Sequence, residues 1–98
     1  MSKNVDEITS LLREHRPTLH AKYRVSELSI FGSYARGQQT QESDVDILIG
    51  YDQAPTLWML TELKDYLGDV LGLRVDVVTQ RGLKERIRSR VLAEAIKV

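Results

Sequence analysis

The sequence predicts an α+β fold, a small three-stranded mixed sheet whose core packs against helices on one face. Two kinds of pattern indicate this fold. Segments with apolar residues three and four positions apart predict helices, and they alternate with short apolar runs rich in β-branched residues. The expected order is helix, strand, helical turn, strand, helix, strand, and a further C-terminal helix. We expect residues 1–98 to form one domain, because this length is near the small end of what buries a useful core.

The first helix is predicted over residues 5–15, where apolar residues recur at helical spacing. Pro17 carries no N–H group and clashes with the preceding turn, so the helix should kink or restart there and continue to about Tyr23. His15 and His20 have no His or Cys partner at metal-ligand spacing. We interpret both histidines as surface or packing residues.

Three strands and a second helix are predicted from the middle of the chain. The strands cover residues 26–31, 44–50 and 74–79, which are rich in residues that favour strands. The helix covers residues 56–71, which carry a broad apolar stripe. Gly72 directly after it predicts a C-cap, because glycine accepts the left-handed conformation that ends many helices.

Two features of the helices leave alternatives open. Trp58 falls on the polar face of its helix, so it either folds over the adjoining turn or contacts a protein partner. A last helix is predicted over residues 83–94, with Leu83, Ile87 and Val91 facing inward. Its basic residues form a solvated face, or they meet an acidic partner or phosphate groups. These residues are Arg81, Lys84, Arg86, Arg88 and Arg90.

Composition excludes several classes of protein. The chain has no cysteine, so it has no disulfide or thiolate metal site, and a reducing cytoplasm is the expected location. It has no apolar run of about 18 residues and no apolar N-terminal segment, so we expect neither a membrane span nor a signal peptide. The net charge is zero, although residues 81–98 carry +4. A wholly basic chain would indicate nucleic acid as a direct partner, and this chain does not.

A phosphate site is predicted where the strand at residues 26–31 ends. Ser33 would cap a short helix over residues 34–36, and the unpaired N–H groups of a helix start attract phosphate. Gly32 would let the backbone approach the ligand closely, because it has no side chain. The Ser33 hydroxyl and the Arg36 guanidinium would add a hydrogen bond and a fixed positive charge.

A pair of carboxylates begins the next strand. Asp44 and Asp46 are two residues apart, so they point to the same face, with side chains roughly 6–7 Å apart, while Val45 and Ile47 point to the core. Two such carboxylates repel each other unless a cation lies between them, and Mg²⁺ accepts carboxylate, phosphate and water oxygens. The same alternation points Leu48 outward, so the metal site should end at Asp46.

Either motif alone is common at turns and strand ends, but the two together are specific. Residues 32–37, Gly-Ser-Tyr-Ala-Arg-Gly, and residues 43–48, Ser-Asp-Val-Asp-Ile-Leu, resemble the signature of the DNA polymerase β-like nucleotidyltransferase superfamily. The chain length and the exact residues of the first motif resemble those of its minimal branch, the MNT or MntA-like antitoxins. The resemblance implies the mixed-sheet fold predicted above and transfer of a nucleotide.

The resemblance also implies a third carboxylate on a neighbouring strand, and Asp76 matches it. Asp44, Asp46 and Asp76 would then hold two Mg²⁺ ions. Asp76 would complete the metal site or take the proton from the attacking hydroxyl. Gly32 and Ser33 would hold the triphosphate of ATP.

The chain offers no second domain to hold an acceptor, so we expect another protein to present it. The resemblance implies a HEPN-domain toxin that is neutralised when AMP is added to a tyrosine hydroxyl, and it leaves a hetero-oligomer of the two proteins open. Two other functions stay open. The protein could be a non-catalytic antitoxin that covers its partner's active site, or a small-molecule nucleotidyltransferase of the antibiotic-modifying kind that needs another subunit or a homodimer.

Overall fold

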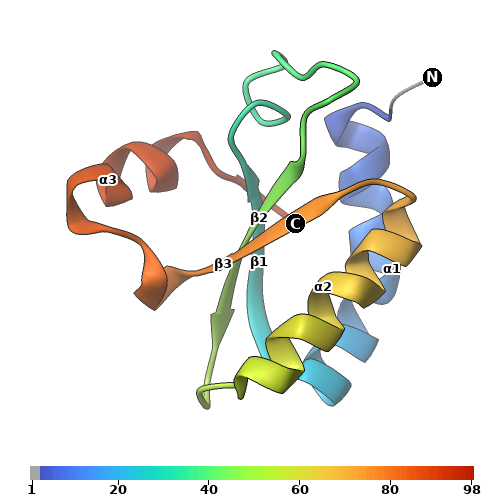
Figure 1. Ribbon diagram of the computed structural model, residues 1–98, viewed down its shortest axis with the longest axis vertical. Helices are drawn as coiled ribbons and strands as arrows, with labels where there is room; N and C mark the ends of the chain where they lie inside the picture. Colours follow the sequence, from blue (N-terminus) through green and yellow to red (C-terminus); the bar gives the residue numbers. More distant parts are fainter. Residues whose placement is uncertain (1–2) are drawn as a thin grey trace.

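The computed structural model describes residues 3–98 and confirms the α+β class (Figure 1). Apart from the first helix and the short helix expected over residues 34–36, the predicted helices and strands are present with bounds within two residues of the expected ones. In chain order the elements are α1 (Val5–Tyr23), β1 (Val25–Phe31), β2 (Val45–Tyr51), α2 (Leu57–Leu71), β3 (Val75–Thr79), the 3₁₀ turn η1 (Gln80–Gly82), α3 (Glu85–Glu94) and β4 (Ile96–Lys97).

The sheet is mixed, as predicted, but it has a fourth strand in the described chain. The strand order is β3-β2-β1-β4, with β2 parallel to β3 and β1 antiparallel to both of its neighbours. The added strand β4 spans only two residues, which pair with Ser29 and Ile30 of β1. A strand this short has no periodicity of its own, so the sequence pattern could not predict it.

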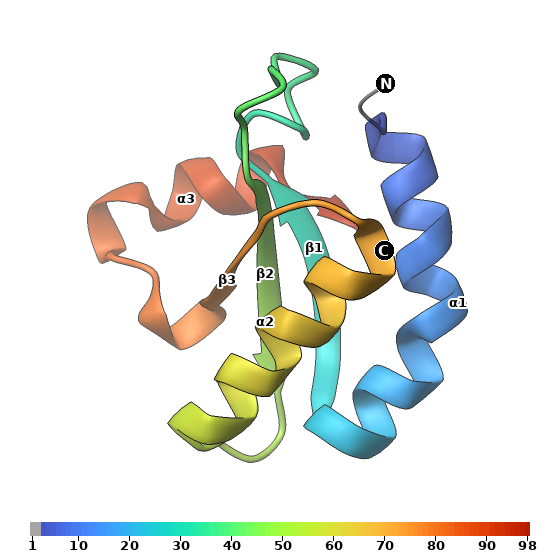
Figure 2. The same cartoon turned by 45° about the vertical axis from the view of Figure 1, so that its right-hand side comes forward.

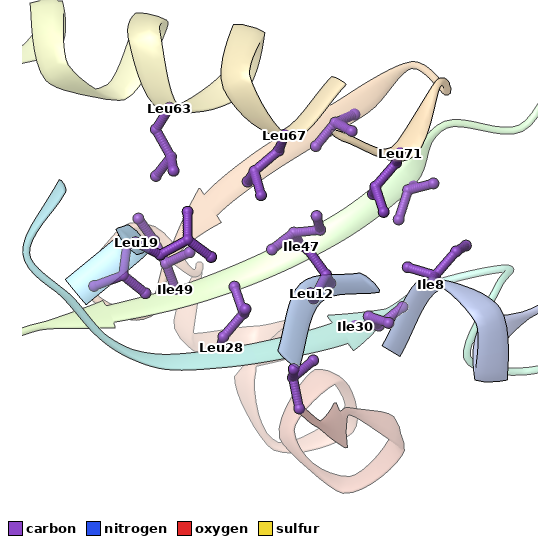
Figure 3. Packing of buried hydrophobic residues seen from close by; sticks show 14 of the residues in the cluster. Ile8, Leu12, Leu19, Leu28, Ile30, Ile47, Ile49, Leu63, Leu67 and Leu71 are labelled. Carbon is purple, nitrogen blue, oxygen red and sulfur yellow. The ribbon is translucent and has the colours of Figure 1, made fainter. Parts of the chain in front are cut away.

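The helices do not all lie on one face, as the sequence had suggested. Figures 1 and 2 show α1 and α2 on one side of the sheet and α3 on the other. The main core lies between α1, α2 and the sheet (Figure 3). It includes Ile8, Leu12 and Leu19 of α1, Leu63, Leu67 and Leu71 of α2, and Leu28, Ile30, Ile47 and Ile49 of the sheet.

Leu48 lies on the second face of the sheet, where no helix was expected. Val45, Ile47 and Ile49 point into the main core, so Leu48 points to the opposite side, as predicted, yet it is only 1% exposed. Helix α3 lies on that side, and its Val91 is 4% exposed. The last helix therefore supplies a cover that strand alternation alone could not reveal.

Helix α1 is one element, although Pro17 lies within it, so the predicted restart does not occur. Asn4 begins the helix by accepting a hydrogen bond from the Glu7 backbone N–H at 2.9 Å. The missing N–H of Pro17 removes one helical hydrogen bond, and packing of the apolar face on both sides of it offsets this cost. His15 lies 2.7 Å from the Tyr66 hydroxyl, which confirms its packing role.

Helix α2 matches its predicted start and end. Thr56 accepts a hydrogen bond from the Met59 backbone N–H at 3.1 Å, and Gly72 ends the helix with a φ of 66°. Trp58 is 71% exposed, so it does not fold over the adjoining turn, and its neighbour Leu57 is 84% exposed. Across residues 3–98, none of the helices combines the length and apolar character needed to traverse a bilayer.

The burial of Leu48 can be tested by truncation. Leu48→Ala is expected to lower the free energy of unfolding by about 2–5 kcal/mol, because it leaves a cavity in a buried site. Leu92→Ala on α3 is the matched control, since Leu92 is 49% exposed, and its cost should stay within about 0.5 kcal/mol. Urea denaturation measures both values. Equal, small costs would mean that α3 does not cover this face of the sheet.

Candidate active site

Residues 32–37 form a hydrogen-bonded turn directly after β1. The Arg36 N–H donates to the Gly32 carbonyl at 3.1 Å, and the Gln38 N–H donates to the Ser33 carbonyl at 2.8 Å. The short helix predicted over residues 34–36 is therefore wrong, since the chain makes a single turn and does not continue it. Three residues are too few to form a helix without support from neighbouring turns.

The turn is anchored by Tyr34, which is 2% exposed and belongs to the main hydrophobic core. Gly32 has a φ of 74°, a conformation that side chains rarely adopt. A Cβ atom on Gly32 would lie 2.1 Å from the Asp46 Oδ2 atom. The sequence predicted that Gly32 makes room for a ligand, and the structure shows that it makes room for the Asp46 carboxylate.

Asp46 and Asp76 are brought together by the sheet. They are register partners on the parallel strands β2 and β3, which lie about 4.8 Å apart, and both alternate with residues that point into the main core. Asp44 directly precedes β2, and its Oδ1 atom lies 3.1 Å from the Arg74 Nε atom in an ion pair. The Arg74 guanidinium also donates to the Glu42 carbonyl. Asp44 is therefore held by an exposed ion pair.

The negative charges of Asp44 and Asp76 both act on the Asp46 carboxylate. Burial raises the pKa of Asp46, and the negative charges of Asp76 and Asp44 raise it further. Arg36 opposes this effect, whereas Glu94 adds to it. This crowding of negative charge disfavours the ionised form of Asp46, and a divalent cation would relieve it.

The donor set suits Mg²⁺, because carboxylate oxygens are its preferred protein ligands. Within residues 3–98, however, no three His, Asp or Glu side chains are arranged so that they could hold a metal ion together. Asp46 and Asp76 already share one face of the sheet. Asp44 would have to leave Arg74 to join them.

Arg36 contacts an unexpected partner. Its Nη1 atom lies 3.0 Å and 3.2 Å from the two carboxylate oxygens of Glu94, and its Nε–H donates to the Gln38 Oε1 at 3.2 Å. Glu94 is the last residue of α3, so this ion pair joins the turn to the helix on the second face. Sequence patterns contained no signal for Glu94, because the two residues are 58 positions apart.

A hollow of about 350 Å³ opens beside the two aspartates, between the sheet and the η1–α3 segment. Lys84 and Arg86 line it, which places two of the basic residues at the rim of the site, whereas Arg88 donates to the Gln80 carbonyl at 2.7 Å. The remaining lining residues are Phe31, Asp46, Asp76, Val78, Gly82, Leu83 and Ile87.

Comparisons with known proteins identify the family of the chain. The family model of the nucleotidyltransferase domain matches residues 12–98. The protein adenylyltransferase MntA of Thermococcus cleftensis is 43% identical over 94 residues, which cover 96% of this chain and 95% of that protein.

Two solved structures share the fold. One is provisionally assigned as a minimal nucleotidyltransferase and has a TM-score of 0.82 and 36% identity, covering 98% of this chain and 97% of that chain. The other, a toxin–antitoxin crystal structure with AMP-PNP, has a TM-score of 0.71 and 26% identity, covering 97% of this chain and 72% of that chain.

The chain therefore belongs to the nucleotidyltransferase domain family. Its relatives further identify the minimal, MntA-like branch, as the motifs at residues 32–37 and 43–48 predicted. The protein is thus an enzyme of the nucleotidyltransferase class, and its relatives are of the protein adenylyltransferase type.

The role of Gly32 can be tested against a second glycine of the same turn. Gly32→Ala and Gly37→Ala should each lose about 1–2 kcal/mol of unfolding free energy, since both positions have φ near 70°. Only Gly32→Ala also displaces the Asp46 carboxylate, because nothing lies within 4 Å of a Cβ on Gly37. Nucleotide transfer should therefore fall in the Gly32 variant alone. An equal loss of activity in both variants would contradict this role.

The raised pKa of Asp46 predicts that Asp46→Asn stabilises the metal-free protein at neutral pH. The folded state holds the Asp46 proton more tightly than the unfolded chain does, so ionisation above the ordinary value of 3.8 costs folding stability. The gain should be full above the folded-state pKa and should vanish as the pH falls below 3.8.

Thermal unfolding between about pH 3 and pH 8 measures this difference. Asp52→Asn, in the exposed turn after β2, is the control and should show no comparable gain. A gain for Asp46→Asn that stays constant across the whole range would show that electrostatic crowding is not its cause.

Proposed function

We propose that the protein transfers AMP from ATP to a hydroxyl of a partner protein, a HEPN-domain toxin, and so acts as the antitoxin of the pair. The placement of Asp46 beside both Asp76 and the Gly32–Ser33 turn carries this proposal. It is supported by the name of the MntA relative, a protein adenylyltransferase, and by the related toxin–antitoxin structure with AMP-PNP. A tyrosine hydroxyl as acceptor and a cytoplasmic location are parts of the proposal.

The triphosphate of ATP would lie on the turn at residues 32–37. Backbone N–H groups and the Ser33 hydroxyl can donate to its oxygens. Arg36 would contribute charge, because its contacts with Glu94 and Gln38 use Nη1 and Nε and leave the Nη2 hydrogens for a phosphate. The ion pair with Glu94 would hold the guanidinium in place for this contact.

The three aspartates would hold Mg²⁺ once Asp44 has left Arg74. When bound, such ions neutralise phosphate charge and activate the attacking hydroxyl. Asp76 would accept the proton of that hydroxyl, whose oxygen forms a bond to the α-phosphorus while the bond to pyrophosphate breaks. The exposed carboxylate of Asp76 suits this role, since it can be reached from solvent and from the hollow.

A partner protein is expected to bring the acceptor to this site. The exposed side chains of Leu57 and Trp58 offer an apolar contact for a hetero-oligomer. The related toxin–antitoxin structure supports such an assembly.

One incubation tests this function, using α-labelled ATP, Mg²⁺ and a HEPN-domain protein from the same organism. We expect label on that protein, and a loss of roughly a hundredfold or more in rate for Asp46→Asn and Asp76→Asn, because several kcal/mol of transition-state stabilisation are removed. Asp52→Asn is the control and should keep full activity. Complex formation without label, with unchanged neutralisation by both variants, would instead show a non-catalytic antitoxin. Label on a small molecule alone would show the antibiotic-modifying type of enzyme.

A further inference from the structure

We propose that a basic groove along α1 and the first half of β1 binds a short, extended, acidic segment of another protein. The groove consists of three adjoining hollows of about 380, 350 and 300 Å³. The first shares Arg16 and Ser26 with the second and His20 with the third. This binding site is separate from the transfer site described above, and it needs no nucleotide.

Most of the positive charge of the groove comes from one side of α1. Arg13, Arg16, His20 and Arg24 follow one another at intervals of three or four residues, so they lie on the same side of the helix. All four are exposed. Neither of the two ion pairs found within residues 3–98 involves any of them. Their charges are therefore available to carboxylates of another molecule.

Acidic residues are outnumbered in the lining of the groove. The three hollows are lined by four arginine or lysine side chains, the fourth being Lys97 of β4, and by the two carboxylates of Glu27 and Asp52. The Glu27 carboxylate already accepts a hydrogen bond from the Gln80 Nε2 atom at 2.7 Å. The excess of positive charge favours an acidic ligand.

The backbone of β1 is a second, independent feature of the groove. On the outer edge of β1, β4 pairs only with Ser29 and Ile30, and one further hydrogen bond reaches the Leu28 carbonyl. Within residues 3–98, no strand covers this edge over residues 25–27. Ser26 also lacks a register partner on β2, because the pairing is irregular there. An uncovered strand edge can pair with the backbone of an extended peptide.

The combination of charge and strand edge favours a polypeptide over a nucleic acid. A nucleic acid would match the cations through its phosphates but would leave the strand edge unpaired, whereas an acidic peptide uses both. The zero net charge of the chain also does not indicate a nucleic acid. The open edge covers three residues, roughly 10 Å of strand, so the bound segment is short.

The groove is remote from the aspartates of the transfer site. Val25 begins β1, whereas Asp46 pairs with Phe31 at its other end, roughly 20 Å along the strand. Figures 1 and 2 show the end of α1 and the start of β1 together at the end of the sheet opposite the turn at residues 32–37. A protein segment held in the groove therefore leaves Asp46 and Asp76 uncovered.

Amide NMR of the full-length protein tests the groove with three synthetic peptides, each blocked at both ends. The acidic probe alternates glutamate with threonine, which favours strands. The second probe has lysine in place of glutamate. The third is the acidic peptide with a methyl group on every backbone nitrogen, which keeps its charge but cannot donate to a strand. We expect only the acidic probe to shift the amide signals of residues 25–28 saturably, and added NaCl to weaken its binding severalfold.

Two charge-removing substitutions on α1 form a matched pair. Arg13→Gln removes a charge that lines the groove, whereas Lys22→Gln removes one from another side of the same helix. Arg13→Gln should raise the Kd of the acidic probe about threefold, and Arg13→Gln with Arg24→Gln about tenfold. Lys22→Gln should match the wild type. All three side chains are exposed, so each variant should keep the thermal unfolding midpoint of the wild type.

Several outcomes would overturn the proposal. Equal binding of the N-methylated probe would show that no strand pairing occurs, and binding of the lysine probe, shifts elsewhere or no shifts would show that the groove does not select an acidic peptide. Displacement of the acidic probe by oligouridylate would assign the groove to nucleic acid. Shifts of the same amides on diluting the protein alone would assign it to a second copy. None of these measurements uses ATP, so they are independent of the labelling experiment for the proposed function.

Discussion

The close approach of Gly32 to the Asp46 carboxylate is the constraint on which the site depends. Pairing of Phe31 with Asp46 across β1 and β2 brings the end of one strand against the start of the next. No side chain fits between them, since a Cβ on Gly32 would lie 2.1 Å from Asp46 Oδ2. The turn that we propose to bind phosphate and the Asp46 carboxylate that we propose to bind metal are thereby fixed relative to each other by backbone pairing, which is more rigid than side-chain contacts alone.

The two faces of the sheet have different roles. One face packs against α1 and α2 and supplies most of the hydrophobic stability. The other carries Asp46 and Asp76, whose charges would be costly inside a core. Helix α3 lies on this second face, opposite α1 and α2 (Figure 2). Leu48 is buried on the same face, and the hollow opens beside the aspartates. A stable core and an accessible acidic site thus coexist in a sheet only four strands wide.

Basic and acidic residues are equal in number in the sequence, and the fold also brings several of them together. The basic segment at residues 81–98 returns to the acidic site, so that Lys84 and Arg86 face Asp46 and Asp76 across the hollow. Arg36 is paired with Glu94, and Asp44 is paired with Arg74. Without nucleotide, these ion pairs limit the repulsion among the carboxylates, whose effect remains visible in the raised pKa of Asp46. Substrate binding would exchange some of these pairs for phosphate and metal contacts.

The sequence by itself determined the order and type of the main helices and strands, and the family, because each of these depends on local spacing. Only the tertiary structure decided that α3 lies on the second face, that two residues form β4, and that Leu48 is buried. It also decided the partners of Asp44 and Arg36. These features join segments far apart in the chain, and packing of the whole molecule selects them, so no local pattern records them.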